Sequence, residues 1–143
     1  IFDAFLSEER VKAFLHGHSF TGNPLACAAA CASLDLFEKE ETWAEIDAIG
    51  KRNAAFIETI KFNPQVKDVR GIGTILAIEL NDSESGYFSQ KKEIAYHYFL
   101  ENGLLLRPLG NVIFINPPYC LTEDEQQYIF DVISSFLNEL NGN

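Results

Sequence analysis

Two of the three asparagine-proline pairs in this chain, Asn23-Pro24 and Asn63-Pro64, constrain where helices can begin and end. Asparagine is a favourable N-cap, and proline suits the first position of a helix but cannot continue one. The first pair is followed by LACAAACASLDLF, which is rich in alanine, the best helix former. The two pairs therefore predict a helix that starts at residue 24 and a helical region that has ended by residue 63.

Four helices are expected in all. The first two run over 24 to about 40 and from about 42 to 60, with a break near Glu41-Thr42. A third, capped by Ser89, runs to residue 101 and ends at Asn102-Gly103 in the left-handed conformation. A capping box over 122–125 starts a closing helix at 123–140. Apolar residues at three- and four-residue spacing are predicted to face the core: Trp43, Ile46, Ile49, Phe56, Ile57, Ile60, Ile129, Val132, Ile133, Phe136 and Leu140.

Short apolar runs predict strands at 66–69, 74–80, 104–107 and 112–115. A glycine-rich bend at 70–73 and a tight turn at 108–111 join them in pairs. Residues 1–15 suggest one short helical turn leading into an extended stretch, and residues 16–23 a loop. The order of helices and strands predicts an α/β fold of the α+β kind, a small sheet covered by helices.

Composition narrows the classes of function. The chain has 143 residues, with 21 acidic against 11 basic side chains, which argues against binding to nucleic acid or to an anionic membrane. Three cysteines without a CxxC pair fit a reducing cytoplasm, and Cys27 and Cys31 are expected to be small buried residues. The chain has no methionine, so we expect it to be a piece of a longer protein.

The loop HGHSFTGNP has the composition of an anion site. Glycines and hydroxyl residues just before a helix N-terminus present N–H and O–H donors at the positive end of the helix dipole. Ser19 and Thr21 can each donate to a phosphate; the alternative is that they only cap the helix and its turn. His16 and His18 do not predict a metal site, because structural sites need three or four ligands.

Arg107 ends the apolar run LLLRP and precedes a rigid turn. A guanidinium in this position can form a bidentate contact with a carboxylate, although an ordinary salt bridge is an equal alternative. Arg70, in VRGIG, is interpreted as a structural ion-pair former. The residues alone indicate a domain that helps to bind an anion and a carboxylate, and no catalytic or metal-ligating set is found among them.

Three segments carry a resemblance to a known family. HGHSFTGNPLACAAACASL resembles the segment that follows the catalytic lysine in class III aminotransferases, which are fold-type I pyridoxal-phosphate enzymes. VRGIGTILAIEL is similar to the strand pair of their small domain. GLLLRPLGNVIFINPPYCLTEDE resembles the branch of this class that converts 8-amino-7-oxononanoate to 7,8-diaminononanoate in biotin synthesis.

The resemblance implies a role for four residues. Ser19 matches a Ser or Thr that hydrogen-bonds the phosphate of pyridoxal phosphate, and His18 lies beside it in the cofactor-binding pair, where some members have a proline. Gly17 matches a glycine whose backbone lies against the substrate. Arg107 matches the arginine that binds the substrate's carboxylate. Phe114 departs from a tyrosine found in some members of the branch, so packing would hold the substrate's tail where those members use a hydroxyl group.

The resemblance also implies an organisation. Residues 1–23 would belong to the end of a large domain that is missing here, and residues 24–143 would form the C-terminal small domain, led by an interdomain helix. The parent would be a cytoplasmic homodimer in which loop 17–19 completes the other subunit's site. The catalytic lysine and the aspartate that pairs with the pyridine nitrogen would lie before Ile1, so the chain alone is predicted to be inactive.

Two alternatives remain open from the sequence. The parent could be another class III ω-aminotransferase, acting on ornithine or 4-aminobutyrate, or the chain could be a non-catalytic domain for binding or dimerisation. The amino donor, S-adenosylmethionine or lysine, is also left open.

Overall fold

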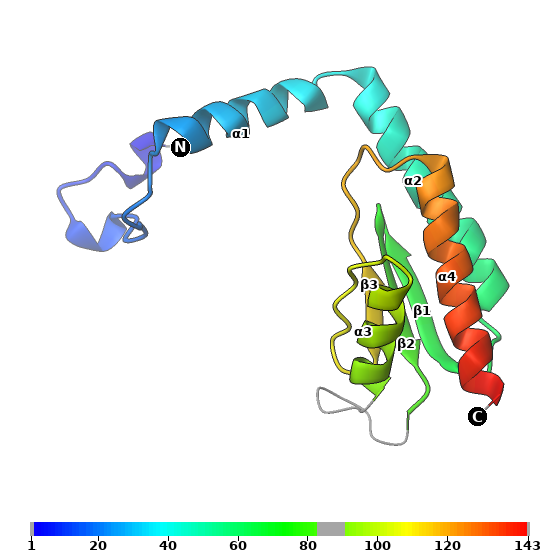
Figure 1. Ribbon diagram of the computed structural model, residues 1–143. Coiled ribbons are helices and arrows are strands. Elements are labelled where there is room, and N and C mark those ends of the chain that lie inside the picture. Colours follow the sequence, from blue (N-terminus) through cyan, green and yellow to red (C-terminus); the bar gives the residue numbers. More distant parts are fainter. Residues whose placement is uncertain (1, 83–90, 143) are drawn as a thin grey trace. The chain divides into compact units, whose positions relative to one another are not determined.

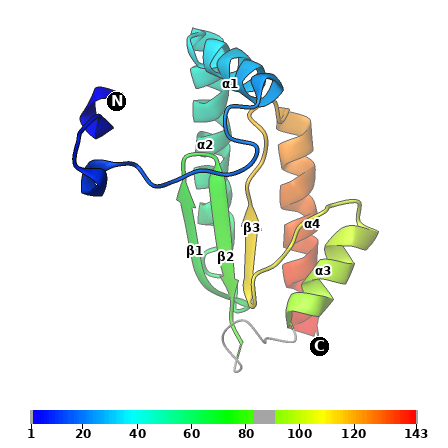
Figure 2. The ribbon, with the colours of Figure 1, turned by 90° about the vertical axis from the view of Figure 1, so that its left-hand side faces the viewer.

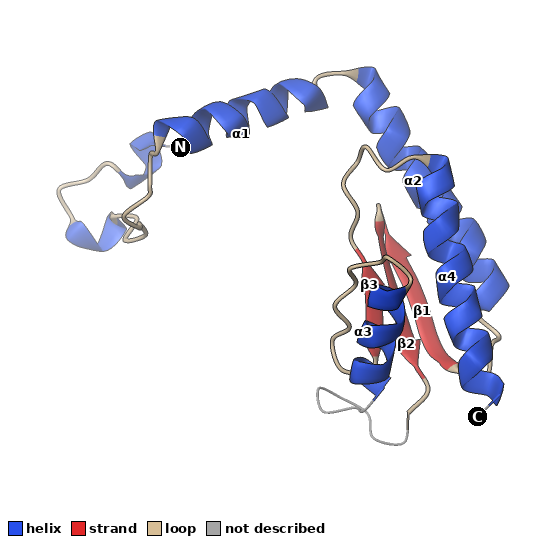
Figure 3. Ribbon diagram, viewed as in Figure 1, coloured by secondary structure: helices blue, strands red, loops and turns tan. Residues whose placement is uncertain are grey.

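The computed structural model describes residues 2–82 and 91–142. The chain divides into two compact units, Ile1–Glu38 and Lys39–Asn143. Figure 3 shows that the first unit contains helices only, whereas the second combines helices with a sheet. The mixed α/β fold expected from the sequence is confirmed. No helix in the described part of the chain combines the length and the apolar character needed to span a membrane.

The first unit contains two short 3-10 helices, Phe2–Phe5 and Arg10–Lys12, and the helix α1, Pro24–Phe37. The expected extended stretch after the first turn is wrong at Arg10–Lys12, where local hydrogen bonds close a second turn. Asn23 caps α1 as predicted. Its Oδ1 accepts hydrogen bonds from the N–H groups of Leu25 at 3.0 Å and Ala26 at 3.2 Å.

No residue of α1 is buried. Leu25 is 82% exposed, and Cys27 and Cys31 are exposed as well. The prediction that the two cysteines are small buried residues is therefore wrong for this chain. The physical reason is that the described residues provide no covering layer for α1, so its small side chains remain in contact with solvent.

The second unit contains a three-stranded antiparallel sheet in the order β1-β2-β3. The strands are β1, Val66–Ile72; β2, Ile75–Leu80; and β3, Val112–Ile115. The helices are α2, Glu40–Ile60; α3, Lys91–Glu101; and α4, Glu123–Gly142. Helices α2 and α4 lie side by side along one face of the sheet, with α3 next to α4 (Figures 1 and 2).

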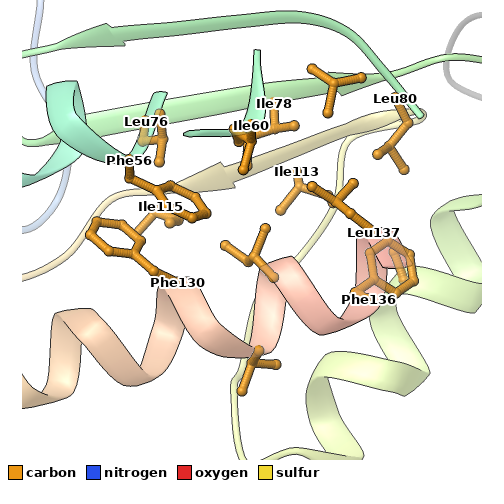
Figure 4. Close-up of a cluster of buried hydrophobic side chains, with 14 of the residues drawn as sticks. Phe56, Ile60, Leu76, Ile78, Leu80, Ile113, Ile115, Phe130, Phe136 and Leu137 are labelled. Carbon is orange, nitrogen blue, oxygen red and sulfur yellow. The ribbon is translucent and has the colours of Figure 1, made fainter. Parts of the chain in front are cut away.

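The core lies between the sheet and these helices (Figure 4). Side chains alternate along a strand, so Ile78 and Ile113 face the helices while Ala77 and Phe114, which pair in register, share the opposite face. The rings of Phe56 on α2 and Phe130 on α4 stack with their centroids 4.2 Å apart. Most of the predicted core residues are buried or half-buried, but Trp43 is 56% exposed and does not belong to the core.

Two expected boundaries moved. The first helix ends at Phe37 and the second begins at Glu40, because Lys39 is extended. Glu40 and Glu41 thereby lie in the first turn of α2, where the helix dipole favours negative charge. The expected bend at 70–73 is also shorter: β1 continues to Ile72, and the chain turns at Gly73, whose φ is +54°.

The predicted strand over 104–107 does not form. The N–H of Leu106 donates to the carbonyl of Leu104, so the backbone turns on itself instead of entering the sheet. Pro108 has no N–H to offer a neighbouring strand. The expected tight turn does form one residue further on, where Leu109 pairs with Val112 and Gly110 has a φ of +62°.

The C-terminus of α3 and the N-terminus of α4 form the capping motifs predicted from the sequence. Gly103 has a φ of +71°, and the N–H of Leu104 donates to the carbonyl of Phe99 at 2.8 Å, which closes α3 in a Schellman motif. Glu125 accepts hydrogen bonds from the N–H and the hydroxyl of Thr122 at 2.9 and 2.8 Å, the capping box expected at the start of α4. The predicted cap Ser89 lies outside the described residues.

A buried polar network joins α2, α4 and the turn between β1 and β2. The Nε2 of Gln126 donates to the Oδ1 of Asn53 at 2.8 Å and to the carbonyl of Ile49 at 3.2 Å. The Nδ2 of Asn53 donates to the carbonyl of Thr74 at 3.0 Å. Asn53 and Gln126 are only 3% and 2% exposed, so the network fixes the hairpin against both helices.

Candidate functional site

The loop before α1 is held by a small hydrogen-bonded ring around Thr21. The Thr21 hydroxyl accepts from the N–H of His18 at 2.9 Å and lies 3.0 Å from its Nδ1. The N–H of Thr21 donates back to the carbonyl of His18 at 3.0 Å, which closes a turn through Ser19 and Phe20. Thr21 therefore shapes the loop, while Asn23 caps the helix.

Ser19 sits at the tip of this turn and is exposed. Its hydroxyl has no hydrogen-bond partner among the described residues. The ring of His18 stacks on that of Phe20, with centroids 4.4 Å apart and planes within 5°. Gly17 has open space where a side chain would begin. The loop thus presents a free hydroxyl beside an open backbone.

Arg107 is positioned by the turn that follows it. Leu109 and Val112 exchange two backbone hydrogen bonds of 2.8 and 3.1 Å. Asn111, inside that turn, is buried, and its Nδ2 donates to the carbonyl of Leu80 at 2.9 Å. These bonds tie the turn to β2, and the buried Pro108 fixes the backbone next to Arg107.

The side chain of Arg107 lines a pocket of about 580 Å³ between α3 and the start of β3. Arg107 is exposed and makes no ion pair or hydrogen bond with any described residue. Phe114 and Leu109 supply an apolar wall. Tyr96 and Lys92, one turn apart on α3, line the opposite side together with Glu93. The pocket therefore combines an available guanidinium with an apolar surface.

Tyr96 and Lys92 were not among the residues predicted for a site. Their four-residue spacing places them on one face of α3, and Gly103 turns the chain back along that face. This signal could have been found in the sequence, but the helix also offers Glu93 and His97 at the same spacing, which form an ion pair at 4.0 Å. Glu93 also lines the pocket, so the spacing alone does not show which residues of α3 face it.

Arg70 forms the structural ion pairs expected of it. Its guanidinium pairs with Asp68 and lies 3.7 Å from Glu79, on the face of the sheet opposite the core. Lys67 donates to Glu79 at 2.7 Å, and this hydrogen bond is the main cause that lowers the pKa of Glu79. Arg70 is engaged in this cluster, in contrast to Arg107.

The predicted site residues fall in different units. Gly17, His18 and Ser19 belong to Ile1–Glu38, and Arg107 belongs to Lys39–Asn143. The structure therefore describes an exposed polar loop and a pocket with an available arginine, each within its own unit.

Comparison with known proteins shows the family of the chain. The sequence pattern of the class III aminotransferases matches residues 1–137. The adenosylmethionine-8-amino-7-oxononanoate aminotransferase of Synechococcus elongatus is 39% identical over 140 residues, which cover 98% of this chain and 32% of that protein. The chain thus spans about a third of the length of the curated relatives it matches.

Solved structures agree. The crystal structure of adenosylmethionine-8-amino-7-oxononanoate aminotransferase from Methanocaldococcus jannaschii superposes with a TM-score of 0.80 at 36% identity, over 96% of this chain and 33% of that one. An omega transaminase from Pseudomonas jessenii, solved in complex with PMP, shares the fold with a TM-score of 0.75 at 23% identity, over 90% of this chain and 30% of that one. On the match along residues 1–137, this chain belongs to the class III aminotransferase family.

Proposed function

We propose that this chain is the C-terminal part of a pyridoxal-phosphate-dependent aminotransferase that converts 8-amino-7-oxononanoate to 7,8-diaminononanoate in biotin synthesis. Relatives that carry this name are 36–39% identical along most of the chain. The single structural observation that carries the proposal is Arg107, whose guanidinium lines a pocket and has no partner among the described residues.

The pocket suits a substrate of this chemistry. The proposed substrate has a carboxylate at one end, and a keto and an amino group at the other end of an alkyl chain. A guanidinium holds a carboxylate through two parallel charge-assisted hydrogen bonds. Phe114 and Leu109 give the alkyl chain an apolar surface to pack against. Arg107 would thus orient the substrate from the end that does not react.

The loop at 17–19 fits the phosphate of the cofactor. Ser19 offers an unused hydroxyl donor, and the contact of His18 Nδ1 with Thr21 leaves Nε2 for another partner. Gly17 leaves room for the substrate to approach the backbone. When bound, pyridoxal phosphate supplies the electron sink and the carrier for the amino group. Within the proposal, His18 and Ser19 bind the cofactor, and Gly17 and Arg107 bind the substrate.

The wider organisation is part of the same proposal. Residues 1–23 would end the large domain and residues 24–143 would form the small domain of a cytoplasmic homodimer. The 17–19 loop would complete the partner subunit's site. The catalytic lysine would lie elsewhere in the full-length enzyme, so the chain of 143 residues should show no turnover alone. The amino donor is S-adenosylmethionine or lysine, and the names of the relatives favour the former.

The test runs the half-reaction backwards with the full-length enzyme, so that the amino donor does not matter. The visible absorption band of the bound cofactor is followed while 7,8-diaminononanoate is added. Loss of the band with this diamine supports the proposal. Loss only with ornithine or 4-aminobutyrate would assign a different class III activity, and the absence of any cofactor band would leave a binding domain.

Arg107→Ala tests the role of the guanidinium. Loss of a charge-assisted bidentate contact should raise the KM for 8-amino-7-oxononanoate by about 10- to 100-fold, with cofactor binding unchanged. Arg107→Lys keeps the charge but not the two-pronged geometry, and its KM should lie between those of the wild type and the alanine variant. A KM that does not change in Arg107→Ala contradicts the assignment.

A further inference from the structure

A second polar group faces the same pocket as Arg107. Tyr96 lies on α3, one turn after Lys92, and lines the pocket together with Arg107 and Phe114. Its side chain is half-buried, and its hydroxyl makes no hydrogen bond with any described residue. A tyrosine whose ring is partly covered normally finds a partner for its hydroxyl. The hydroxyl of Tyr96 is therefore available to a ligand in the pocket that it lines.

Tyr98, on the same helix, has a structural role and serves as a comparison for Tyr96. Its ring packs against those of Phe99 and Phe136, at centroid distances of 5.9 and 5.1 Å. Burial and a hydrogen bond with Glu139 raise the pKa of its hydroxyl. Tyr98 therefore has both its ring and its hydroxyl engaged within the protein. Among the described residues, the ring of Tyr96 contacts that of its sequence neighbour His97, and its hydroxyl makes no hydrogen bond.

We propose that Tyr96 is a second substrate-recognition residue, whose hydroxyl donates a hydrogen bond to the carboxylate held by Arg107. This inference rests on the proposed function, in which Arg107 binds that carboxylate. A guanidinium fork occupies two of the roughly four lone-pair positions of a carboxylate, which leaves acceptors for a neutral donor. The tyrosine ring adds to the apolar wall along the alkyl chain.

The charges around the pocket agree with an anionic end group. Arg107 and Lys92 contribute two positive charges to the described lining, against one negative charge from Glu93, whose carboxylate lies 4.0 Å from the Nε2 of His97. An uncharged hydroxyl donor strengthens the recognition of a carboxylate without adding another ion to desolvate. Tyr96 would therefore separate carboxylate-bearing substrates from ω-amines that lack one.

The experiment compares Tyr96→Phe with wild type in the full-length enzyme, using 8-amino-7-oxononanoate and its methyl ester as substrates. The variant should raise the KM for the acid about tenfold and leave kcat within about twofold, because one hydrogen bond to a charged group is lost. The KM for the ester should rise much less, because the neutral ester carbonyl is a weaker acceptor than the carboxylate. Tyr98→Phe is the matched control and should leave both KM values unchanged.

The outcomes separate this inference from the proposed function. If the wild-type enzyme does not convert the acid at all, the proposed function fails. If it does, and Tyr96→Phe leaves the KM unchanged, only the role of Tyr96 is overturned. An equal rise in KM for acid and ester also overturns it, because that result means the hydroxyl does not act on the charged carboxylate. In an Arg107→Ala background the effect of Tyr96→Phe should shrink, since both residues bind one carboxylate.

Discussion

Gln126 uses both ends of its amide inside the protein. Its Oε1 accepts from the Nε of Arg52, while its Nε2 donates to Asn53 and to the carbonyl of Ile49. Because these partners are buried or half-buried, water cannot replace the amide if it is removed. Removal of the Gln126 side chain should therefore lower the stability of the fold.

Gln126→Leu keeps a similar volume but leaves the partners of the amide unpaired. The free energy of unfolding should fall by about 2–3 kcal/mol, measured by urea titration of this chain with far-UV circular dichroism. Gln127→Leu is the control, since Gln127 bonds only to Asp131 on the exposed side of α4, and it should change stability by less than about 0.5 kcal/mol. Equal midpoints for the two variants would contradict a structural role for the network.

Chemistry-bearing residues could be predicted where the local pattern was unusual. An arginine that ends an apolar run and a hydroxyl-rich loop before a proline stand out without any fold. Asn53, Gln126 and Tyr96 do not stand out, because polar residues on amphipathic helices resemble surface residues. Asn53 and Gln126 are separated by 73 positions in the sequence. Only the packing of α2 against α4 brings them together.

The start of α4 illustrates how one element depends on a charge. The N–H and the hydroxyl of Thr122 both donate to Glu125, and these bonds lower the pKa of that carboxyl from its ordinary value of 4.5. A carboxyl whose pKa is lower in the folded state contributes stability that is present above its unfolded pKa. That contribution disappears as the pH falls through the lowered folded value.

Glu125→Gln removes this titration and should reduce the acid sensitivity of the fold. Wild type should be more stable than the variant at neutral pH and should lose that advantage on acidification below about pH 4.5. Urea titrations at neutral and acidic pH measure the difference. Glu123→Gln, in the same first turn, controls for the loss of a negative charge near the helix dipole. A wild-type advantage that persists at acidic pH would contradict the linkage.

Elements with their own start and stop signals were predicted best. Asn23, Gly103 and the box at 122–125 act through hydrogen bonds within a few residues, so the sequence contains all the partners. The strand expected at 104–107 failed for the opposite reason. A strand needs a neighbouring strand edge, and LLLR offers the right side chains without showing whether such an edge is available. The helix break moved because Glu40 and Glu41 favour the start of α2 over the end of α1.

At the scale of the whole molecule, the two candidate features belong to different units. The exposed loop with Ser19 belongs to one unit, and the pocket with Arg107 belongs to the other. Under the proposed function, the cofactor's phosphate and the substrate's carboxylate are held by different subunits. Sequence patterns can identify the Ser19 loop and the Arg107 pocket. They do not show whether a loop serves the pocket of its own subunit or that of the partner subunit.

Mixed dimers of the full-length enzyme test this division between subunits. One chain carries Ser19→Asp, whose carboxylate repels the phosphate, and the other chain carries Arg107→Ala. The homodimer of either variant should have little activity at low substrate concentration. If Ser19 serves the partner's site, a mixed dimer contains one site with both residues intact. Random mixing should then restore about a quarter of wild-type activity, because half of the dimers are mixed and each has one intact site.

A second mixture, of wild type with the doubly substituted chain, distinguishes the same two arrangements. Wild type mixed with a chain that carries both substitutions should retain only about a quarter of the activity, since neither site of a mixed dimer would have both residues intact. If Ser19 and Arg107 serve the same subunit's site, the first mixture stays inactive and the second retains about half. The two mixtures therefore move in opposite directions under the two arrangements, and a general loss of stability in either variant cannot produce that pattern.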